Sequence, residues 1–496
     1  MEIAVVDAPA GGVEADVLVF PVSDPVALSE PAQGLDRLLE GGLSRLVEMG
    51  ELRGDAGRVT LLHTEGKLGA RRVAAVGLGE PPHDGDRVRA AAAAAARRTL
   101  EAGGTTMAWL LDPAGLPAGE QARAVVDGAA LGPSRNGRWK TEEEDEGELA
   151  RLTVCGPGAG SADEEARRAA VVARWVNTCR DRVNAPGNML TPEGLAAWAE
   201  EVASAHPSLR FEALGPEEIR AAGMGAFAAV SQGSHNPPRL ITLAYEPERP
   251  ARPDLRAAFV GKAITFDSGG LSLKPAAGMD EMKSDMGGGG AVVAAMGAIA
   301  ELGLPVRVLA VVPACENMPG GHSYRPGDVV TALNGTTIEI ANTDAEGRLI
   351  LADALWFARE SGATHVVDLA TLTGGIVVAL GDLYAGLFGN DEAWVAEIEA
   401  AGAASGDLVW RFPLHERYGR YNDSAFADLK NSSDLKQASP VLAAAFLERF
   451  AGEGPWAHVD IAGTAYLERG RGDYYSELGA TGYGVRLLAE LARRLA

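Results

Sequence analysis

Residues 290–314 read GAVVAAMGAIAELGLPVRVLAVVPA, and this stretch decides the fold class of the C-terminal part of the chain. Its first half, 290–302, has the length and composition of an apolar helix, and 306–314 is a continuous apolar run typical of a buried strand. Apolar strands that alternate with helices indicate a largely parallel sheet covered on both faces. The stretch therefore predicts an α/β fold.

The same alternation continues on both sides of this stretch. Predicted strands cover 239–246, 256–261, 364–370 and 457–462, and predicted helices cover 348–361 and 481–495. Residues 329–340 contain an Asn-Gly turn and have the pattern of a β-hairpin. We therefore expect a domain at 184–496 with a mostly parallel central sheet flanked by helices.

The first part of the chain also alternates between strand-like and helix-like segments. The predicted strands are 16–23, 58–63, 71–79, 105–112 and 151–156, and the predicted helix is 88–102. This pattern predicts an N-terminal α/β domain at 1–158. A helix at 159–183 is expected to connect it to the second domain, and the acidic stretch within 134–148 is predicted to be a solvated loop.

Length and composition narrow the class of protein. A chain of 496 residues exceeds the size at which a single core keeps growing, so two domains are expected. The formal net charge of −23 argues against non-specific binding to nucleic acid or anionic membranes. There is no apolar run of membrane-spanning length and no basic segment before Arg37 that would suit a secretory signal. The three cysteines are far apart and form no disulfide framework, so we expect a cytoplasmic protein with no membrane association.

Charged residues follow several of the predicted strands. In parallel α/β sheets, ligands bind beyond the carboxyl ends of the strands, so these side chains are expected to meet at one edge. The residues concerned are Lys262, Asp267, Lys274, Asp285, Glu316, Asp344, Glu346 and Arg348.

Lysines are concentrated in this part of the chain. Only seven of the chain's 45 basic residues are Lys, yet Lys262, Lys274 and Lys283 fall within 22 residues. A lysine, unlike an arginine, can be driven neutral by burial or by neighbouring cations. The cluster therefore suggests a function that requires an amine.

The grouping of carboxylates suggests a metal centre. Asp267 or Asp285 alone would fit a helix cap or an ion pair, but several carboxylates in one crevice repel one another and lose hydration. Two divalent cations would relieve this repulsion, because carboxylate oxygens can bridge metals roughly 3.5–4 Å apart. A lysine amine could join them if the metals lower its pKa. The sequence therefore predicts a dinuclear site.

Three strings in this region are distinctive: VGKAITFDSGGLSLKP at 260–275, MKSDMGG at 282–288 and NTDAEGRL at 342–349. Together they resemble the leucine aminopeptidase (cytosol aminopeptidase) family of dinuclear-metal exopeptidases. Looser matches follow in the family's order: NAPGNMLTP at 184–192, VDLATLTG at 367–374, HVDIAGTA at 458–465 and GATGYGVRLL at 479–488. The resemblance covers 180–496, and over 1–155 it is one of architecture, implying a macrodomain-like N-terminal domain.

The resemblance implies a set of ligands for each of two metals. One metal would be held by Asp267, Asp344 and Glu346, and a second by Lys262, Asp267, Asp285 and Glu346, so that Asp267 and Glu346 bridge. In the family, a bridging hydroxide attacks the first peptide carbonyl and the substrate's free α-amine binds the second metal.

The resemblance further implies the remaining site residues and the assembly. Lys274 would stabilise the oxyanion, and Arg348 would hold a bicarbonate that acts as general base. Met282 and Thr371 would line the pocket for the first side chain of the peptide, which suggests Leu or another apolar residue. The cofactors would be two divalent ions per subunit, Mn or Zn, and the assembly would be a homohexamer.

Two other classes of function fit parts of the chain. A binding or regulatory protein is one, since some relatives also bind DNA and the N-terminal domain resembles nucleotide-binding modules. The complete ligand set argues against a scaffold without activity, and the acidity argues against DNA. Another dinuclear hydrolase, acting on amides or phosphoesters, is the second, and the pair Lys262 and Lys274 favours the aminopeptidase.

Overall fold

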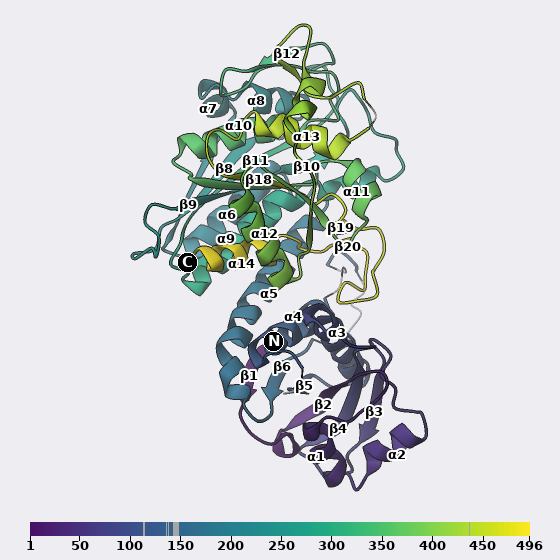
Figure 1. Cartoon of the computed structure of the whole chain (residues 1–496). Helices are drawn as coiled ribbons and strands as arrows, with labels where there is room; N and C mark the ends of the chain where they lie inside the picture. The colour runs from purple at the N-terminus through teal and green to yellow at the C-terminus, as the bar shows by residue number, and fades with distance from the viewer. Residues whose placement is uncertain (113–114, 135, 137, 142–147, 436) are drawn as a thin grey trace. The chain divides into compact units, whose positions relative to one another are not determined.

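The computed structural model describes residues 1–112, 115–134, 136, 138–141, 148–435 and 437–496 (Figure 1). The chain forms two compact units, one of residues 1–177 and 468–478 and the other of residues 178–467 and 479–496. Most of the acidic run in the predicted loop at 134–148 lies outside the described residues. The domain boundaries at 158 and 183 remain a prediction from the sequence.

The first unit is built on a six-stranded sheet in the order β1-β6-β5-β2-β4-β3, parallel except at β3. Its strands are β1 (Glu2–Val6), β2 (Ala15–Val22), β3 (Val59–His63), β4 (Ala70–Gly77), β5 (Thr106–Leu110) and β6 (Arg151–Cys155). Its helices are α1 (Glu30–Leu38), α2 (Gly42–Glu48), α3 (Gly85–Glu101) and α4 (Ala118–Leu131), and α5 (Asp163–Val183) begins in this unit.

Two apolar cores cover the two faces of this sheet. Side chains of α3, α4 and the start of α5 pack with β2, β4, β5 and β6 on one face. Side chains of α1 and α2 pack with β2, β4 and β5 on the other. The predicted α/β fold of the N-terminal part is confirmed, and its central parallel strands β2, β4 and β5 are covered on both faces as that fold requires.

The second unit has a nine-stranded sheet whose main path is β16-β15-β18-β14-β9-β11-β8-β7, with β10 beside β11. Its strands are β7 (Leu209–Leu214), β8 (Arg239–Tyr245), β9 (Arg256–Gly261), β10 (Ala263–Asp267), β11 (Arg307–Asn317), β14 (His365–Ala370), β15 (Ala385–Gly389), β16 (Val409–Arg411) and β18 (Trp456–Asp460). The central pairs are parallel, and β8, β7 and β15 add antiparallel pairs towards the edges. The predicted mostly parallel sheet is confirmed.

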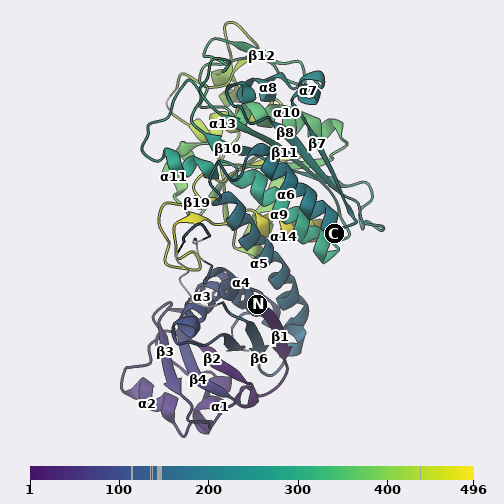
Figure 2. The same cartoon turned by 180° about the vertical axis from the view of Figure 1, so that it is seen from behind.

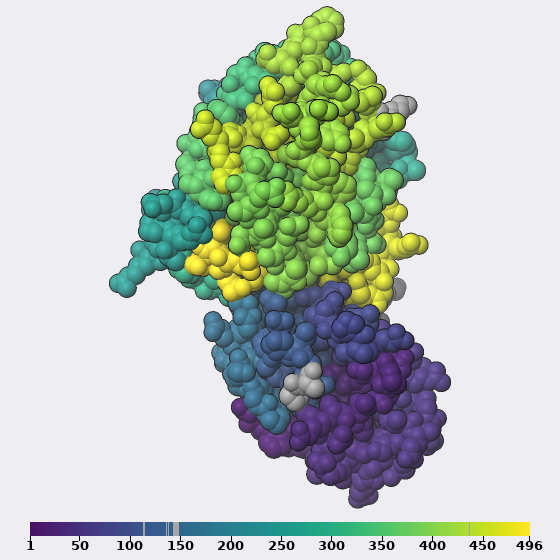
Figure 3. Space-filling view, viewed as in Figure 1, coloured from purple at the N-terminus to yellow at the C-terminus, as the bar shows by residue number. Residues whose placement is uncertain are grey.

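Helices cover both faces of this sheet, as Figures 1 and 2 show from opposite sides. One layer contains α6 (Pro192–Ala205), α9 (Gly287–Leu302), α12 (Glu392–Ser405) and α14 (Val485–Leu495). The other contains α8 (Gly225–Val230), α10 (Gly347–Glu360) and α13 (Ser439–Glu448), which share one apolar core with the strands. The green to yellow segments, from the C-terminal half of the chain, form most of the face of this unit seen in Figure 3.

Shorter elements surround the layers. They are β12 (Val329–Thr331), β13 (Thr337–Glu339) and β17 (Leu429–Lys430) in a three-stranded sheet, the pair β19 (Tyr466–Leu467) and β20 (Gly479–Ala480), α7 (Pro216–Ala221), α11 (Gly374–Leu380) and the 3-10 helix η4 (Met279–Ser284). The antiparallel pair β12 and β13 confirms the predicted hairpin. Within the described ranges, no helix combines the length and the apolar content that a bilayer crossing demands.

The predicted helix at 481–495 begins later than expected. It starts at Val485, because Gly482 and Gly484 adopt φ values of +69° and +98° and form a turn instead of a helical start.

Helix α9 begins with four consecutive glycines, Gly287 to Gly290. A Cβ at Gly288 would lie 2.1 Å from the carbonyl oxygen of Leu369, so only glycine lets α9 approach the end of β14.

Candidate metal centre

The carboxyl ends of neighbouring parallel strands bring the predicted charged residues together. Lys262 follows β9 directly, and Thr371 follows β14. Asp267 is the last residue of β10, and Asp285 follows η4. The loop before α10 supplies the remaining acids, so the sheet edge that general α/β rules favour for ligands is where they meet.

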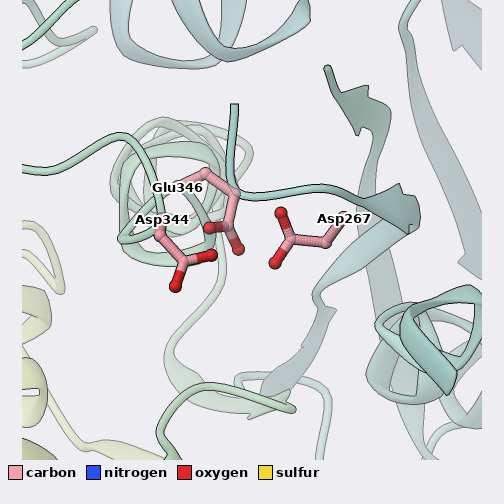
Figure 4. A group of neighbouring side chains, drawn as sticks. All are labelled: Asp267, Asp344 and Glu346. Carbon is pink, nitrogen blue, oxygen red and sulfur yellow. The ribbon is translucent and has the colours of Figure 1, made fainter. Parts of the chain in front are cut away.

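Three of the acids form a compact group. Asp267, Asp344 and Glu346 each offer a carboxylate oxygen, and these oxygens lie within 4.8 Å of one another. Figure 4 shows the three carboxylates turned towards one another, with Asp267 coming from the strand and the other two from the loop. Asp267 and Glu346 are buried, and the Asp344 side chain keeps 32% of its exposure. Such a group can hold a metal ion.

Two lysines sit among the acids. Lys262 Nζ lies 2.7 Å from Asp285 Oδ1 and 2.9 Å from Glu346 Oε1, and it donates to the carbonyl oxygen of Thr371. Gly347 makes this possible, because a Cβ there would lie 2.7 Å from Lys262 Cε.

The second lysine reaches the acids from the loop between β10 and η4. Lys274 Nζ lies 2.8 Å from Asp267 Oδ2 and 2.5 Å from Asp344 Oδ1. Together with Asp285, the site therefore contains four carboxylates and two ammonium groups, so negative charge is in excess.

Burial and the neighbouring charges perturb the titration of the site. Burial raises the pKa of Asp285 to about 8, even though Lys262 opposes the shift. Burial, with the nearby charge of Glu346, raises the pKa of Asp267 to about 6. Burial would also raise the pKa of Glu346, but Lys262 and Lys274 outweigh it and the pKa is lowered. A bound cation would favour the ionised form of every one of these acids.

Arg348 lies in the first turn of α10 and is 8% exposed. Its Nη1 donates to the carbonyl oxygen of Asn431, and its Nε has no hydrogen-bond partner within the described part of the chain. Burial lowers its pKa to about 10, an effect that the charges of Glu346 and Asp460 oppose. A buried guanidinium with unused donors suits a small anion.

Met282 and Thr371 lie on elements that border the group. Met282 is a half-buried residue of η4, three positions before Asp285. The Thr371 hydroxyl donates to Asp285 Oδ1 at 2.7 Å. Both therefore lie near the acids, and their role in a substrate pocket stays a prediction.

Glu316 was expected in the same crevice, but its side chain forms hydrogen bonds outside the group of acids. It lies inside β11, where its carboxylate accepts hydrogen bonds from Ser234 and Asn236. Successive side chains of a strand point to opposite faces, so the next residue, Asn317, is the one that reaches the acids. Asn317 Nδ2 donates to Asp267 Oδ1 at 2.8 Å and to the carbonyl oxygen of Thr343 at 2.9 Å.

The residues that hold the loops in place were also not predicted. Thr343 Oγ1 donates to the carbonyl oxygen of Gly269 and accepts from Ser272 N, which joins the loop of Lys274 to the loop of Asp344. Asn431 contacts the second loop from a segment far along the chain. The period of two along β11 could have revealed Asn317, but no local pattern marks Asn431.

The donor set fits divalent cations. Its atoms are carboxylate oxygens with the amines of Lys262 and Lys274 beside them, and such oxygen ligands suit Mn, Mg or Zn. Asp285 Oδ2 is buried and has no hydrogen-bond partner among the described residues, so an acceptor stays free for a cation or an ammonium group. Fold and site together define a two-domain α/β protein with a candidate centre for divalent cations.

Comparison with known proteins identifies the family. Residues 177–489 match the catalytic domain of the cytosol aminopeptidase family, and residues 17–143 match its N-terminal domain. Proteins named probable cytosol aminopeptidase are similar over almost the whole chain. The one from Geotalea uraniireducens (strain Rf4) is 43% identical over 93% of each chain, and the one from Solibacter usitatus (strain Ellin6076) is 43% identical over 99% of each.

A solved structure agrees. The bottromycin maturation enzyme BotP superposes with a TM-score of 0.84 at 37% identity, covering 97% of this chain and 99% of BotP, and a second BotP structure is a complex with Mn. The chain belongs to the cytosol aminopeptidase family. It is a metal-dependent aminopeptidase, a hydrolase that acts on peptides, and the predicted family is confirmed.

Proposed function

We propose that this aminopeptidase removes Leu or another apolar residue from the amino terminus of peptides, using two divalent cations per subunit. The observation that carries the proposal is the group of Asp267, Asp344 and Glu346, whose ligand atoms lie within 4.8 Å of one another, flanked by two lysines. The Mn bound to BotP supports Mn as one of the ions, and Zn is the alternative.

The acids divide between two cation positions in this proposal. Asp267, Asp344 and Glu346 would hold one cation, and Asp285 and Lys262 would join Asp267 and Glu346 at the other. When bound, the cations would supply Lewis acidity and activate water as a nucleophile near neutral pH. Lys262 would act as a ligand in its neutral form. The carboxylates of Asp285 and Glu346 outweigh burial and raise its pKa, so the amine is protonated in the metal-free protein.

The remaining residues act on the substrate. Lys274 is 22% exposed and lies beside Asp267 and Asp344, so its ammonium group is placed to stabilise an oxyanion that develops next to the acids. Arg348 uses its free donors to hold a bicarbonate that serves as general base. Thr371 and Met282 border Asp285 and line the pocket for the apolar side chain.

A free amino terminus is required in this mechanism. Asp285 Oδ2 is a buried acceptor without a hydrogen-bond partner among the described residues, so it can accept from the free amine of a substrate beside the second cation position, and an acetylated end has no such amine. We expect Leu-Gly to be hydrolysed at least roughly 10²-fold faster than acetyl-Leu-Gly in a discontinuous amino-acid assay. Equal rates for the two peptides would contradict the proposal.

Kinetic profiling tests the rest of the proposed function. The apoenzyme is reconstituted separately with Mn, Zn and Mg and assayed on a panel of chromogenic aminoacyl amides, with phosphoesters as the alternative substrate class. We expect activity on leucyl and similar apolar amides to exceed activity on charged ones. Phosphoester cleavage without amide cleavage would assign the site to a different hydrolase.

We also propose that the enzyme is a cytoplasmic homohexamer, as the resemblance to the family implies. Static light scattering of active fractions at micromolar concentration is expected to give six times the mass of one chain. A monomer that carries full activity would rule out a catalytic need for the hexamer.

A further inference from the structure

Asn431 is a fully buried residue beside the candidate metal centre that no part of the proposed mechanism uses. It follows the short strand β17, and its Oδ1 accepts hydrogen bonds from Ala341 N at 2.8 Å and Asn342 N at 3.2 Å. Its Nδ2 donates to the carbonyl oxygens of Asn342 at 2.7 Å and Ala345 at 3.3 Å. One amide side chain thus pairs with the backbone along most of the loop that carries Asp344.

This loop needs such a partner. Residues 341–346 belong to no helix or strand, so their backbone groups cannot be paired by a regular ladder. Two of the proposed metal ligands, Asp344 and Glu346, are held at its end, where their oxygens must stay near Asp267. The geometry of the ligands therefore depends on side chains that fix the loop from outside.

The backbone of Asn431 extends the same support to Arg348. Its carbonyl oxygen accepts from Arg348 Nη1 at 2.8 Å, and its amide donates to the carbonyl oxygen of Glu339 at 3.0 Å. Glu339 ends β13, which pairs with β17 just before Asn431. Asn431 is therefore held by the small sheet of β13 and β17, and its hydrogen bonds in turn fix the ligand loop and Arg348.

We propose that Asn431 is a positioning residue that fixes Asp344, Glu346 and Arg348 in the arrangement the metal centre requires. The inference rests on the proposed ligand role of Asp344 and Glu346. Outer residues that orient ligands typically change metal affinity or activity by about 10–100-fold when replaced. Asn431 is expected to act in this range although it touches neither carboxylate.

The test compares Asn431→Ala and the equally sized Asn431→Asp with the wild-type protein and with Asn422→Ala. Asn422 is a matched control, because it is 1% exposed and its Nδ2 donates to the carbonyl oxygen of Leu442, away from the ligand loop. Binding of Mn to the metal-free full chain is measured by calorimetric titration, and kcat and KM are measured on a leucyl amide at saturating Mn.

Both Asn431 variants are expected to bind Mn about 10–100-fold more weakly and to lose kcat more than KM. Asn422→Ala is expected to lose thermal stability yet keep wild-type Mn affinity and kcat. In an Asp344→Asn background, Asn431→Ala should add less to the loss of affinity, because residues that act through one loop are not additive.

Wild-type Mn affinity and kcat in either folded Asn431 variant would overturn the inference and leave Asn431 a structural residue only. An Asn431 variant that only melts at a lower temperature, as is expected of Asn422→Ala, would also overturn the inference. Wild-type protein that binds no Mn or Zn would refute the proposed function and this inference with it, so the two failures are distinguishable.

Discussion

Lys274→Ala is expected to lower kcat by roughly 10²–10³-fold while the protein keeps its metals, as for the loss of one oxyanion donor. Lys274 Nζ contacts Asp267 and Asp344 in the structure, so this lysine is a cation that competes with a metal for the same oxygens. Its removal leaves the oxygens free and takes away a positive charge beside them. Metal affinity should therefore be unchanged or higher, and the loss should fall on the chemical step.

The measurement pairs metal analysis with steady-state kinetics. Lys274→Met keeps the length of the side chain without its charge and should match Lys274→Ala, if charge rather than packing matters. Lys67→Ala is the control, because Lys67 forms an ion pair with Glu40 in the first unit and should leave kcat unchanged. A Lys274→Ala protein without metals would make Lys274 a ligand or a structural residue.

The fold could be predicted from the sequence to a large extent, because its strongest signals are local. The stretch at 290–314 became α9 followed by β11, and the Asn-Gly turn became the hairpin of β12 and β13. Strands at or next to an edge of the sheet, such as β7 and β15, carry a weaker pattern and were not predicted. Their place depends on pairing with distant strands, which a local pattern does not encode.

The candidate site could be predicted where residues follow central strands. Lys262 and Asp267 met the rule for strand ends, and the structure brings them beside Glu346. Glu316 met the same rule but points to the opposite face, since β11 extends to Asn317, beyond its predicted end. The direction of one side chain thus depended on the exact end of a strand, which sequence patterns locate poorly.

Asn431 shows what a local pattern cannot supply. It reaches the ligand loop because a two-residue strand, β17, pairs in parallel with β13, some ninety residues earlier in the chain. Neither strand has enough length to create a period of two. Hydrogen bonds that fix functional loops are often of this kind, and only the folded chain reveals them.

Asp344→Asn and Glu346→Gln are expected to lose metal as well as activity, because each removes a charged ligand from the carboxylate group. The loss of metal affinity should exceed the roughly 10–100-fold typical of residues that only orient ligands. Elemental analysis after dialysis and kcat/KM at saturating metal provide the measurement. Glu316→Gln is the matched control, since Glu316 is a buried acid at the same sheet edge that binds Ser234 and Asn236 instead.

Thermal stability without metal separates a ligand from a structural acid. Burial raises the pKa of Asp344, so its ionised form costs stability in the metal-free protein at neutral pH, and the neutral Asn of Asp344→Asn removes that cost. The pKa of Glu346 is lowered, because Lys262 and Lys274 outweigh burial, so its charge stabilises the metal-free fold and Glu346→Gln should lower its Tm. Metal binding stabilises only the folded state, so both variants should show a smaller rise of Tm on adding Mn than the wild type. A metal-free Asp344→Asn protein that melts well below the wild type, with a normal rise on adding Mn, would show that Asp344 supports the fold and is no ligand.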